Sequence, residues 1–146
     1  MAMNEWQRTF LQKLEQGKKK WRKRLEEFLT DRVEPVFAEF EEFAVKNGFE
    51  VSAPKCNKSV RLFKFGLTEN GYIIFRFGQR GVDRAEARYE AFLPGRDRPA
   101  CEANHVQIVD ADEHWVEHQF QQGLDHLVTE FVECDPRGVQ PEPVGA

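Results

Sequence analysis

The sequence predicts an α+β fold in which a five-stranded antiparallel sheet follows a long amino-terminal helix and precedes a carboxy-terminal helix. Two observations indicate this class. In residues 84–91, charged side chains occupy every even position and Ala or Tyr every odd one, a period of two that is typical of a strand with one solvated face. Before residue 45 and after residue 110, apolar residues instead recur every three or four positions, as they do in amphipathic helices.

The amino-terminal helix is predicted over residues 6–44, where large apolar side chains recur at helical spacing. Uninterrupted, it would be ~60 Å long, which exceeds the diameter of a domain of this size. We therefore expect a break near Asp31, because Asp31 and Glu34 match a capping box and Pro35 suits the first turn of a second helix. Residues 4–29 are then an extension that can project from the domain and pair with a partner.

Five strands are predicted from runs of β-branched and aromatic residues. They cover residues 49–53, 60–67, 72–77, 84–91 and 103–109. Pro54 is expected to end the first strand, and Asn70-Gly71 is a hairpin signal between the second and the third. Because every connection is short, successive strands are expected to pair antiparallel, as a meander.

The carboxy-terminal helix is predicted over residues 111–133, with Asp110 and Glu113 as its capping box. Its core-facing stripe consists of Val116, Phe120, Leu124, Leu127, Val128 and Phe131. Residues 134–146 contain three prolines and show no periodicity, so we expect a flexible, disordered tail. Residues 1–133 are therefore predicted to form one α-β5-α domain.

Composition and charge restrict the class of protein. The three cysteines form no CxxC pair and the amino terminus lacks an apolar leader, so we expect a reduced, cytoplasmic protein. No apolar run approaches the ~20 residues of a membrane span. The net charge of −4 conceals a basic start, since residues 1–24 carry eight basic and two acidic side chains.

A basic cluster on the predicted amino-terminal helix is the sharpest compositional signal. It consists of Lys18, Lys19, Lys20, Arg22, Lys23 and Arg24, which surround Trp21. The favoured interpretation is a solvated helix face or a self-association surface, with Trp21 in the apolar stripe. Polyanion binding is the alternative, because cations on a helix can follow phosphates. Binding to a membrane surface is the least favoured reading.

The predicted carboxy-terminal helix carries two further candidate sites. His114 and His118 stand four residues apart, a spacing that can ligate zinc, although both face away from the core stripe and ordinary surface histidines are favoured. Trp115 and Gln119 lie on a second stripe that could anchor a partner, with coverage of Trp115 by the amino-terminal helix as the favoured alternative. No nucleophile or phosphate-binding motif occurs, so no cofactor is expected.

The outer face of the sheet is a further candidate surface. It is predicted to display Leu62, Lys64, Tyr72, Ile74, Arg76, Arg84, Glu86, Arg88 and Glu90. Aromatics among cations can bind a peptide, a partner subunit or a nucleic acid strand. The favoured alternative is a structural one, in which this face is solvated or lies in part beneath the amino-terminal helix.

Three functional hypotheses follow from these patterns. The leading one is a non-enzymatic protein-protein interaction module or adaptor that self-associates, as a dimer, through the amino-terminal helix. The second is a nucleic-acid-binding protein that uses residues 18–24 together with Arg76, Arg84 and Arg88. The third is a metal-dependent enzyme at His114 and His118.

Overall fold

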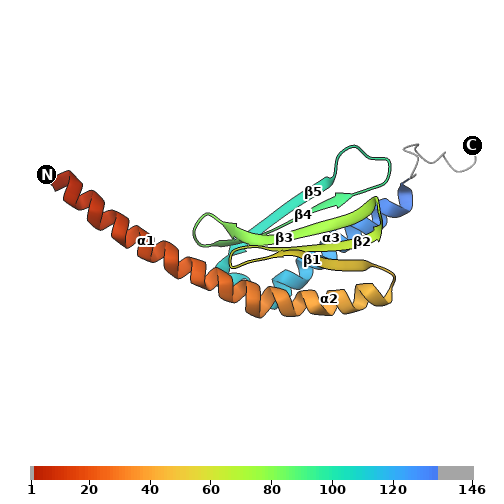
Figure 1. Ribbon diagram of the computed structural model, residues 1–146, viewed down its shortest axis with the longest axis horizontal. Coiled ribbons are helices and arrows are strands. Elements are labelled where there is room, and N and C mark those ends of the chain that lie inside the picture. Colours follow the sequence, from red (N-terminus) through yellow and green to blue (C-terminus); the bar gives the residue numbers. More distant parts are fainter. Residues whose placement is uncertain (1, 135–146) are drawn as a thin grey trace, which may run out of the picture.

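The computed structural model describes residues 2–134 and confirms the predicted order of helix, five-stranded antiparallel sheet and helix (Figure 1). The helical elements are α1 (Ala2–Phe28), the π-helix η1 (Leu29–Val33), α2 (Glu34–Lys46), the 3₁₀ turn η2 (Ile108–Asp110) and α3 (Glu113–Glu133). The tail predicted for residues 134–146 lies outside the described residues, apart from Cys134.

The strands form one sheet in the order β1-β2-β3-β4-β5, and each neighbouring pair is antiparallel. They span β1 (Glu50–Cys56), β2 (Arg61–Thr68), β3 (Gly71–Arg80), β4 (Arg84–Phe92) and β5 (Ala100–Gln107). The predicted meander is therefore confirmed. Helices η1, α2 and α3 pack against one face of this sheet, which becomes the inner face.

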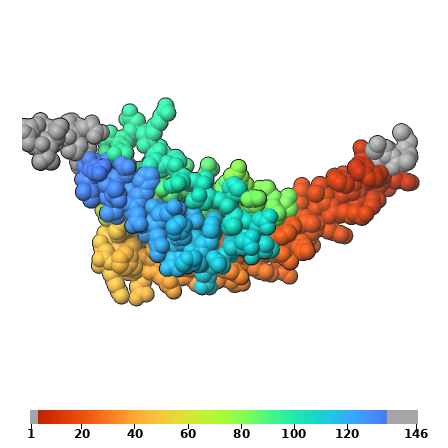
Figure 2. Space-filling view, turned by 180° about the vertical axis from the view of Figure 1, so that it is seen from behind, coloured from red at the N-terminus to blue at the C-terminus, as the bar shows by residue number. Residues whose placement is uncertain are grey.

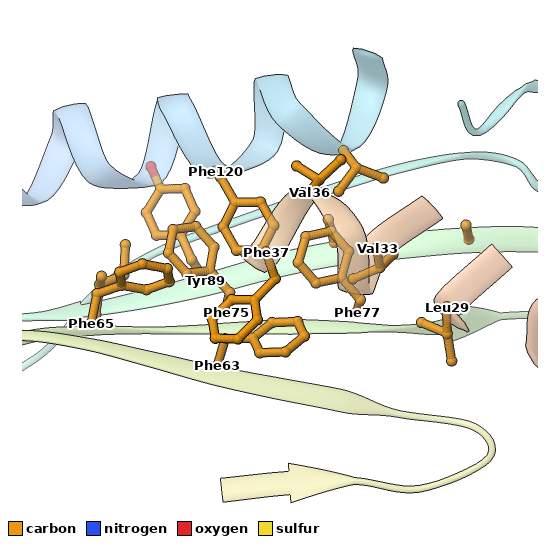
Figure 3. Close-up of a cluster of buried hydrophobic side chains, with 14 of the residues drawn as sticks. Leu29, Val33, Val36, Phe37, Phe63, Phe65, Phe75, Phe77, Tyr89 and Phe120 are labelled. Carbon is orange, nitrogen blue, oxygen red and sulfur yellow. The ribbon is translucent and has the colours of Figure 1, made fainter. Parts of the chain in front are cut away.

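Aromatic side chains fill the space between the inner face and the helices (Figure 3). Phe63, Phe65, Phe75 and Phe77 point from β2 and β3 into this space and are almost completely buried. Phe120 enters from α3, and its ring centroid lies 4.9 Å from that of Phe75 and 5.1 Å from that of Phe77. Phe120 is therefore the point at which α3 and the sheet interlock.

The predicted break near Asp31 is present, but as a change of winding and not as a capped helix end: the π-helix η1 lies between α1 and α2. The backbone N–H of Glu34 donates to the carbonyl of Leu29, five residues earlier, which is the π-helical pattern. Pro35 explains the change, because it has no N–H and its ring would collide with the carbonyl four residues before it in a regular α-helix. The predicted capping box is wrong, since no side chain caps α2.

Arg61 ties the helices to the sheet where β2 begins. Its Nε donates to Oε1 of Glu34 at 3.0 Å, and its other N–H groups reach the carbonyl of Asn57 and, at 3.4 Å, the hydroxyl of Thr30. Arg61 is buried whereas Glu34 is partly exposed. A buried guanidinium is tolerated only when its donors are satisfied, so this network fixes how η1 and α2 sit on the sheet.

Strand β1 continues past Pro54, where the sequence predicted its end. It runs to Cys56, and its register with β2 shifts between Ser52 and Lys55. β1 is an edge strand and has a bulge at this point. The N–H that Pro54 lacks therefore leaves no neighbouring strand without a hydrogen-bond donor.

The start of α3 also differs from the prediction. Asp112, and not Asp110, is the cap, and its carboxylate accepts a hydrogen bond from the N–H of Trp115 at 2.8 Å. Asp110 belongs to η2, which follows a β5 strand that begins and ends earlier than predicted. A helix is capped by a residue with an extended backbone. Asp112 has that conformation, whereas Asp110, two residues earlier, lies in the 3₁₀ turn.

The hairpin between β2 and β3 is confirmed, but Gly71 serves a different purpose from the predicted one. It has no positive φ, so it does not form the left-handed turn that Asn-Gly usually signals. A Cβ at this position would lie 2.7 Å from Cε2 of Phe131. Glycine is therefore required at position 71, because the ring of Phe131 in α3 packs directly on the start of β3.

Candidate interaction surfaces

Helix α1 extends from the folded body as an arm (Figures 1 and 2). It carries an apolar stripe. The exposed fractions are 59% for Trp6, 47% for Phe10, 60% for Leu11 and 38% for Leu14. The rings of Trp6 and Phe10 stack on each other with centroids 5.1 Å apart. At helical spacing the same side continues to Leu25 and Phe28, which are buried in the core. The face of α1 that packs on the folded body therefore extends past the body, where its apolar side chains are exposed.

The basic cluster lies on α1 just before the helix reaches the body. All six of its cations are exposed, and Trp21 is half-buried with the guanidinium of Arg24 4.9 Å from its ring centroid. Arg22 pairs with Glu15 at 2.6 Å, and this hydrogen bond, together with the charge of Arg22, lowers the pKa of Glu15. None of the four lysines forms an ion pair within residues 2–134, so the cluster retains most of its charge.

The alternation that predicted an outer face of the sheet is confirmed. The predicted outer residues are all partly or fully exposed, while their odd-numbered neighbours on β3 and β4 are buried, with Gln79 as an exception. Helix α1 runs away from the sheet and does not cover this face (Figure 1). Tyr72, Ile74, Arg76, Arg84 and Arg88 therefore belong to one continuous surface.

Positive charges face each other across strands β3 and β4 on the outer face. Arg76 is directly opposite Arg88, and Arg80 is directly opposite Arg84. Opposed like charges lower the stability of a sheet. The carboxylate of Glu86 lies 3.7 Å from Arg76 and 3.9 Å from Arg80, and no other ion pair to these four arginines occurs among the described residues. The face therefore retains a surplus of positive charge.

Aromatic rings lie at one end of the same face. Tyr72 and Phe92 stack with centroids 4.7 Å apart and an angle of 20° between their planes. The ammonium of Lys64 lies 4.3 Å from the Tyr72 centroid, and beside it a hollow of about 580 Å³ opens between the ends of β1 and β2. The ring of Tyr72 therefore lies between Phe92 and Lys64, and this cluster of aromatic rings and a cation is suited to contacts with a base and a phosphate together.

The second stripe of α3 lies against β5 and α1. Trp115 is half-buried, with its ring centroid 6.3 Å from that of Phe28, in agreement with coverage by the amino-terminal helix. Gln119 is buried, and its Oε1 accepts a hydrogen bond from Asn104 at 2.9 Å. These contacts hold α3 on the sheet, and Gln119 presents little surface to a partner.

A polar chain links β4, β5, α3 and the loop between the two strands. The hydroxyl of Tyr89 donates to Oε2 of Glu102 at 2.8 Å and lies 2.6 Å from Nδ1 of His126. Glu130 lies 3.8 Å from Nε2 of His126 and 2.8 Å from Arg96. The sequence does not predict this chain, because its members are far apart in sequence and Tyr89 matches an ordinary core position.

Tyr89 makes the stability of the fold sensitive to high pH. Burial, followed by the hydrogen bond and the charge of Glu102, raises the pKa of Tyr89 above its ordinary value of about 10. Above about pH 10 the unfolded chain loses this proton first, so stability that is present at lower pH is lost as pH rises. We expect the stability difference between wild type and Tyr89→Phe, measured by urea unfolding, to shrink from about pH 8 to about pH 11. A difference that stays constant over this range would contradict the assignment.

The histidine pair gives no support to a metal site. His114 and His118 are both exposed, as expected for surface histidines. His114 borders a hollow of about 630 Å³ between η1 and the start of α3. Within residues 2–134, no three His, Cys, Asp or Glu side chains are grouped so that they could hold a metal ion.

None of the helices in the described part of the chain combines the length and the apolar character needed to cross a bilayer. The chain matches no protein-family model, no curated protein sequence and no solved structure.

Proposed function

We propose that the protein is a non-enzymatic interaction module that self-associates through the arm formed by α1. The observation that carries the proposal is the apolar stripe on the arm, where Trp6, Phe10 and Leu14 remain exposed on the face that is buried farther along. Large apolar side chains in one line on a helix are typical of a surface that packs against another helix.

The arm also needs a partner for its own stability. Most helical stability in proteins comes from the packing of an amphipathic face, which the exposed stripe of α1 lacks among the described residues, and Gly17 weakens the helix further. Neighbouring like charges in the basic cluster add a repulsive contribution. Burying a Phe or Leu side chain stabilises an association by ~2 kcal/mol each, so the stripe can offset these costs once it is covered.

Sedimentation velocity tests this proposal. We expect wild type to form dimers between about 1 and about 100 μM, and the double variant Phe10→Asp/Leu14→Asp to raise the dissociation constant more than ~100-fold, because two apolar contacts are lost and two carboxylates would be buried.

The matched control is Gln12→Asp/Gln16→Asp, which changes the charge equally on the opposite side of the same helix. It is expected to change the dissociation constant less than ~5-fold, a shift of ~1 kcal/mol. Wild type that remains monomeric at ~100 μM would refute self-association.

Nucleic-acid binding on the outer face is the second candidate function. The opposed arginine pairs favour it, because a phosphate between Arg76 and Arg88 would relieve the repulsion that they create. The ring of Phe92, which stacks on Tyr72, would contact a base beside these cations.

Fluorescence anisotropy with a labelled single-stranded oligonucleotide tests the second candidate. Arg84→Ala/Arg88→Ala is expected to weaken binding more than ~10-fold and to reduce the slope of log K against log salt by ~1.4, since each lost phosphate contact contributes ~0.7. Lys46→Ala/Lys58→Ala removes the same charge from exposed positions elsewhere and serves as the control. Equal weakening by both variants would leave only a general charge effect and reject a site on the outer face.

A further inference from the structure

We infer that two copies of the chain pair through antiparallel α1 helices, with the twofold axis between residues 15 and 16. This inference rests on the proposed self-association and specifies its geometry. It follows from the spacing of the stripe, from the sizes of its side chains and from the position of its charges.

The spacing indicates helix pairing. Phe10, Leu14, Gly17 and Trp21 follow one another at intervals of four, three and four residues, which is the pattern that lets two helices pack side by side. The pattern continues without a break to Phe28, where the partner surface is the chain's own core. Trp21 already packs in part against the chain's own core, so from Phe10 to Gly17 the surface that completes the packing must come from another molecule.

The side-chain sizes favour reversal of the second helix. In an antiparallel pair centred between residues 15 and 16, Phe10 lies against Trp21 of the second copy and Leu14 against its Gly17. A Cβ at Gly17 would meet nothing within 4 Å, so this position leaves open space for the opposing leucine. A parallel pair would instead place Gly17 against Gly17 and leave a gap on both helices.

The end of each arm would then reach the body of the second copy. In this register Trp6 lies opposite Leu25 of the second copy, close to the point where its α1 packs on η2. Two exposed apolar residues lie beside this point, Val109 of η2 at 58% exposure and Val82 at 40%, and a hydrogen bond from Ile108 to Asp83 joins their two segments. The pairing therefore covers apolar surface on the body as well as on the arm.

The antiparallel arrangement also separates the two basic clusters, although it places Lys18 opposite Lys13 of the second copy and Lys23 opposite its Arg8. A parallel pair places the two basic clusters next to each other, and among the described residues only Arg22 of each cluster forms an ion pair. In the antiparallel pair, the two Trp21 residues are offset by eleven positions, or ~16 Å along the helix, about twice the screening length of ~8 Å at physiological salt.

Distances between spin labels test this arrangement in the full-length chain. Cys56, Cys101 and Cys134 are replaced by serine, and one label is attached at Glu5→Cys or at Gln16→Cys, both on the side of α1 away from the stripe. The antiparallel pair offsets the two Glu5 positions by ~32 Å along the helix and the two Gln16 positions by ~2 Å. We expect the Glu5 labels to be more than ~15 Å farther apart than the Gln16 labels.

Each other outcome has a distinct meaning. Equal distances at the two sites, in a protein that sediments as a dimer, indicate parallel helices and overturn the inference while self-association stands. A dimer in which neither site gives a measurable distance associates through another surface, which overturns the inference and the role of α1. A monomer by sedimentation refutes the proposed function itself.

Discussion

Replacing Phe120 by alanine is expected to lower the free energy of unfolding by about 4 kcal/mol, a large part of the 5–15 kcal/mol typical of a domain. The ring is fully buried and lies between two layers of aromatic residues. Its centroid is 5.2 Å from that of Phe40 in α2, in addition to the contacts with Phe75 and Phe77 in the sheet. Alanine would leave a cavity that neighbours in two rigid layers cannot fill.

Urea unfolding followed by circular dichroism measures this effect. Val132→Ala is the matched control on α3, because its side chain is 77% exposed and its loss should cost less than ~0.5 kcal/mol. A loss of less than ~1.5 kcal/mol for Phe120→Ala would show that the helices and the sheet can close over the cavity, and would contradict the central position given to this ring.

Gly123→Ala is expected to lower the free energy of unfolding by about 2 kcal/mol, although alanine is the better helix former. Helix propensity alone would stabilise α3 by ~1 kcal/mol. A Cβ at this position, however, would lie 2.5 Å from Cζ of Phe75 and 3.0 Å from Cδ1 of Ile73. Both atoms belong to buried side chains of β3 that cannot move aside. The steric overlap therefore outweighs the gain in helix propensity, and the substitution is destabilising.

The sign of the change is the test for Gly123. Gln121→Ala, at an exposed position two residues earlier on the same helix, is the control and should change stability by less than ~0.5 kcal/mol. If Gly123→Ala stabilises the protein in urea unfolding, α3 does not approach the sheet as closely as the structure shows.

The regular features of this fold could be predicted because each depends on local periodicity. The alternation in residues 84–91 identified the sheet and both of its faces, and short connections were sufficient to give the meander. The apolar stripe of α3 was also predicted, although Val128 at its edge is exposed. In each case the same few neighbours in sequence decide both the conformation and the burial.

The features that could not be predicted depend on packing between distant segments. The π-helical turn before Pro35 keeps Leu29 and Val33 directed at the sheet, which a local capping rule does not consider. The bond between Tyr89 and His126 joins residues 37 positions apart. Among the candidate surfaces, the residues of the outer face could be predicted from alternation, whereas the opposed arginine pairs depend on the register of β3 with β4.

The order of the strands also has a consequence for how the chain reaches this structure. Each strand pairs with the one made just before it, so the sheet can grow one hairpin at a time with little loop entropy to overcome. The inner face of the sheet is completed later, because Phe120 belongs to α3, which follows all five strands in the chain. During synthesis the sheet is therefore complete while this face still lacks the part of its cover that α3 supplies, and we expect exposure to chaperones or aggregation to be greatest in that interval.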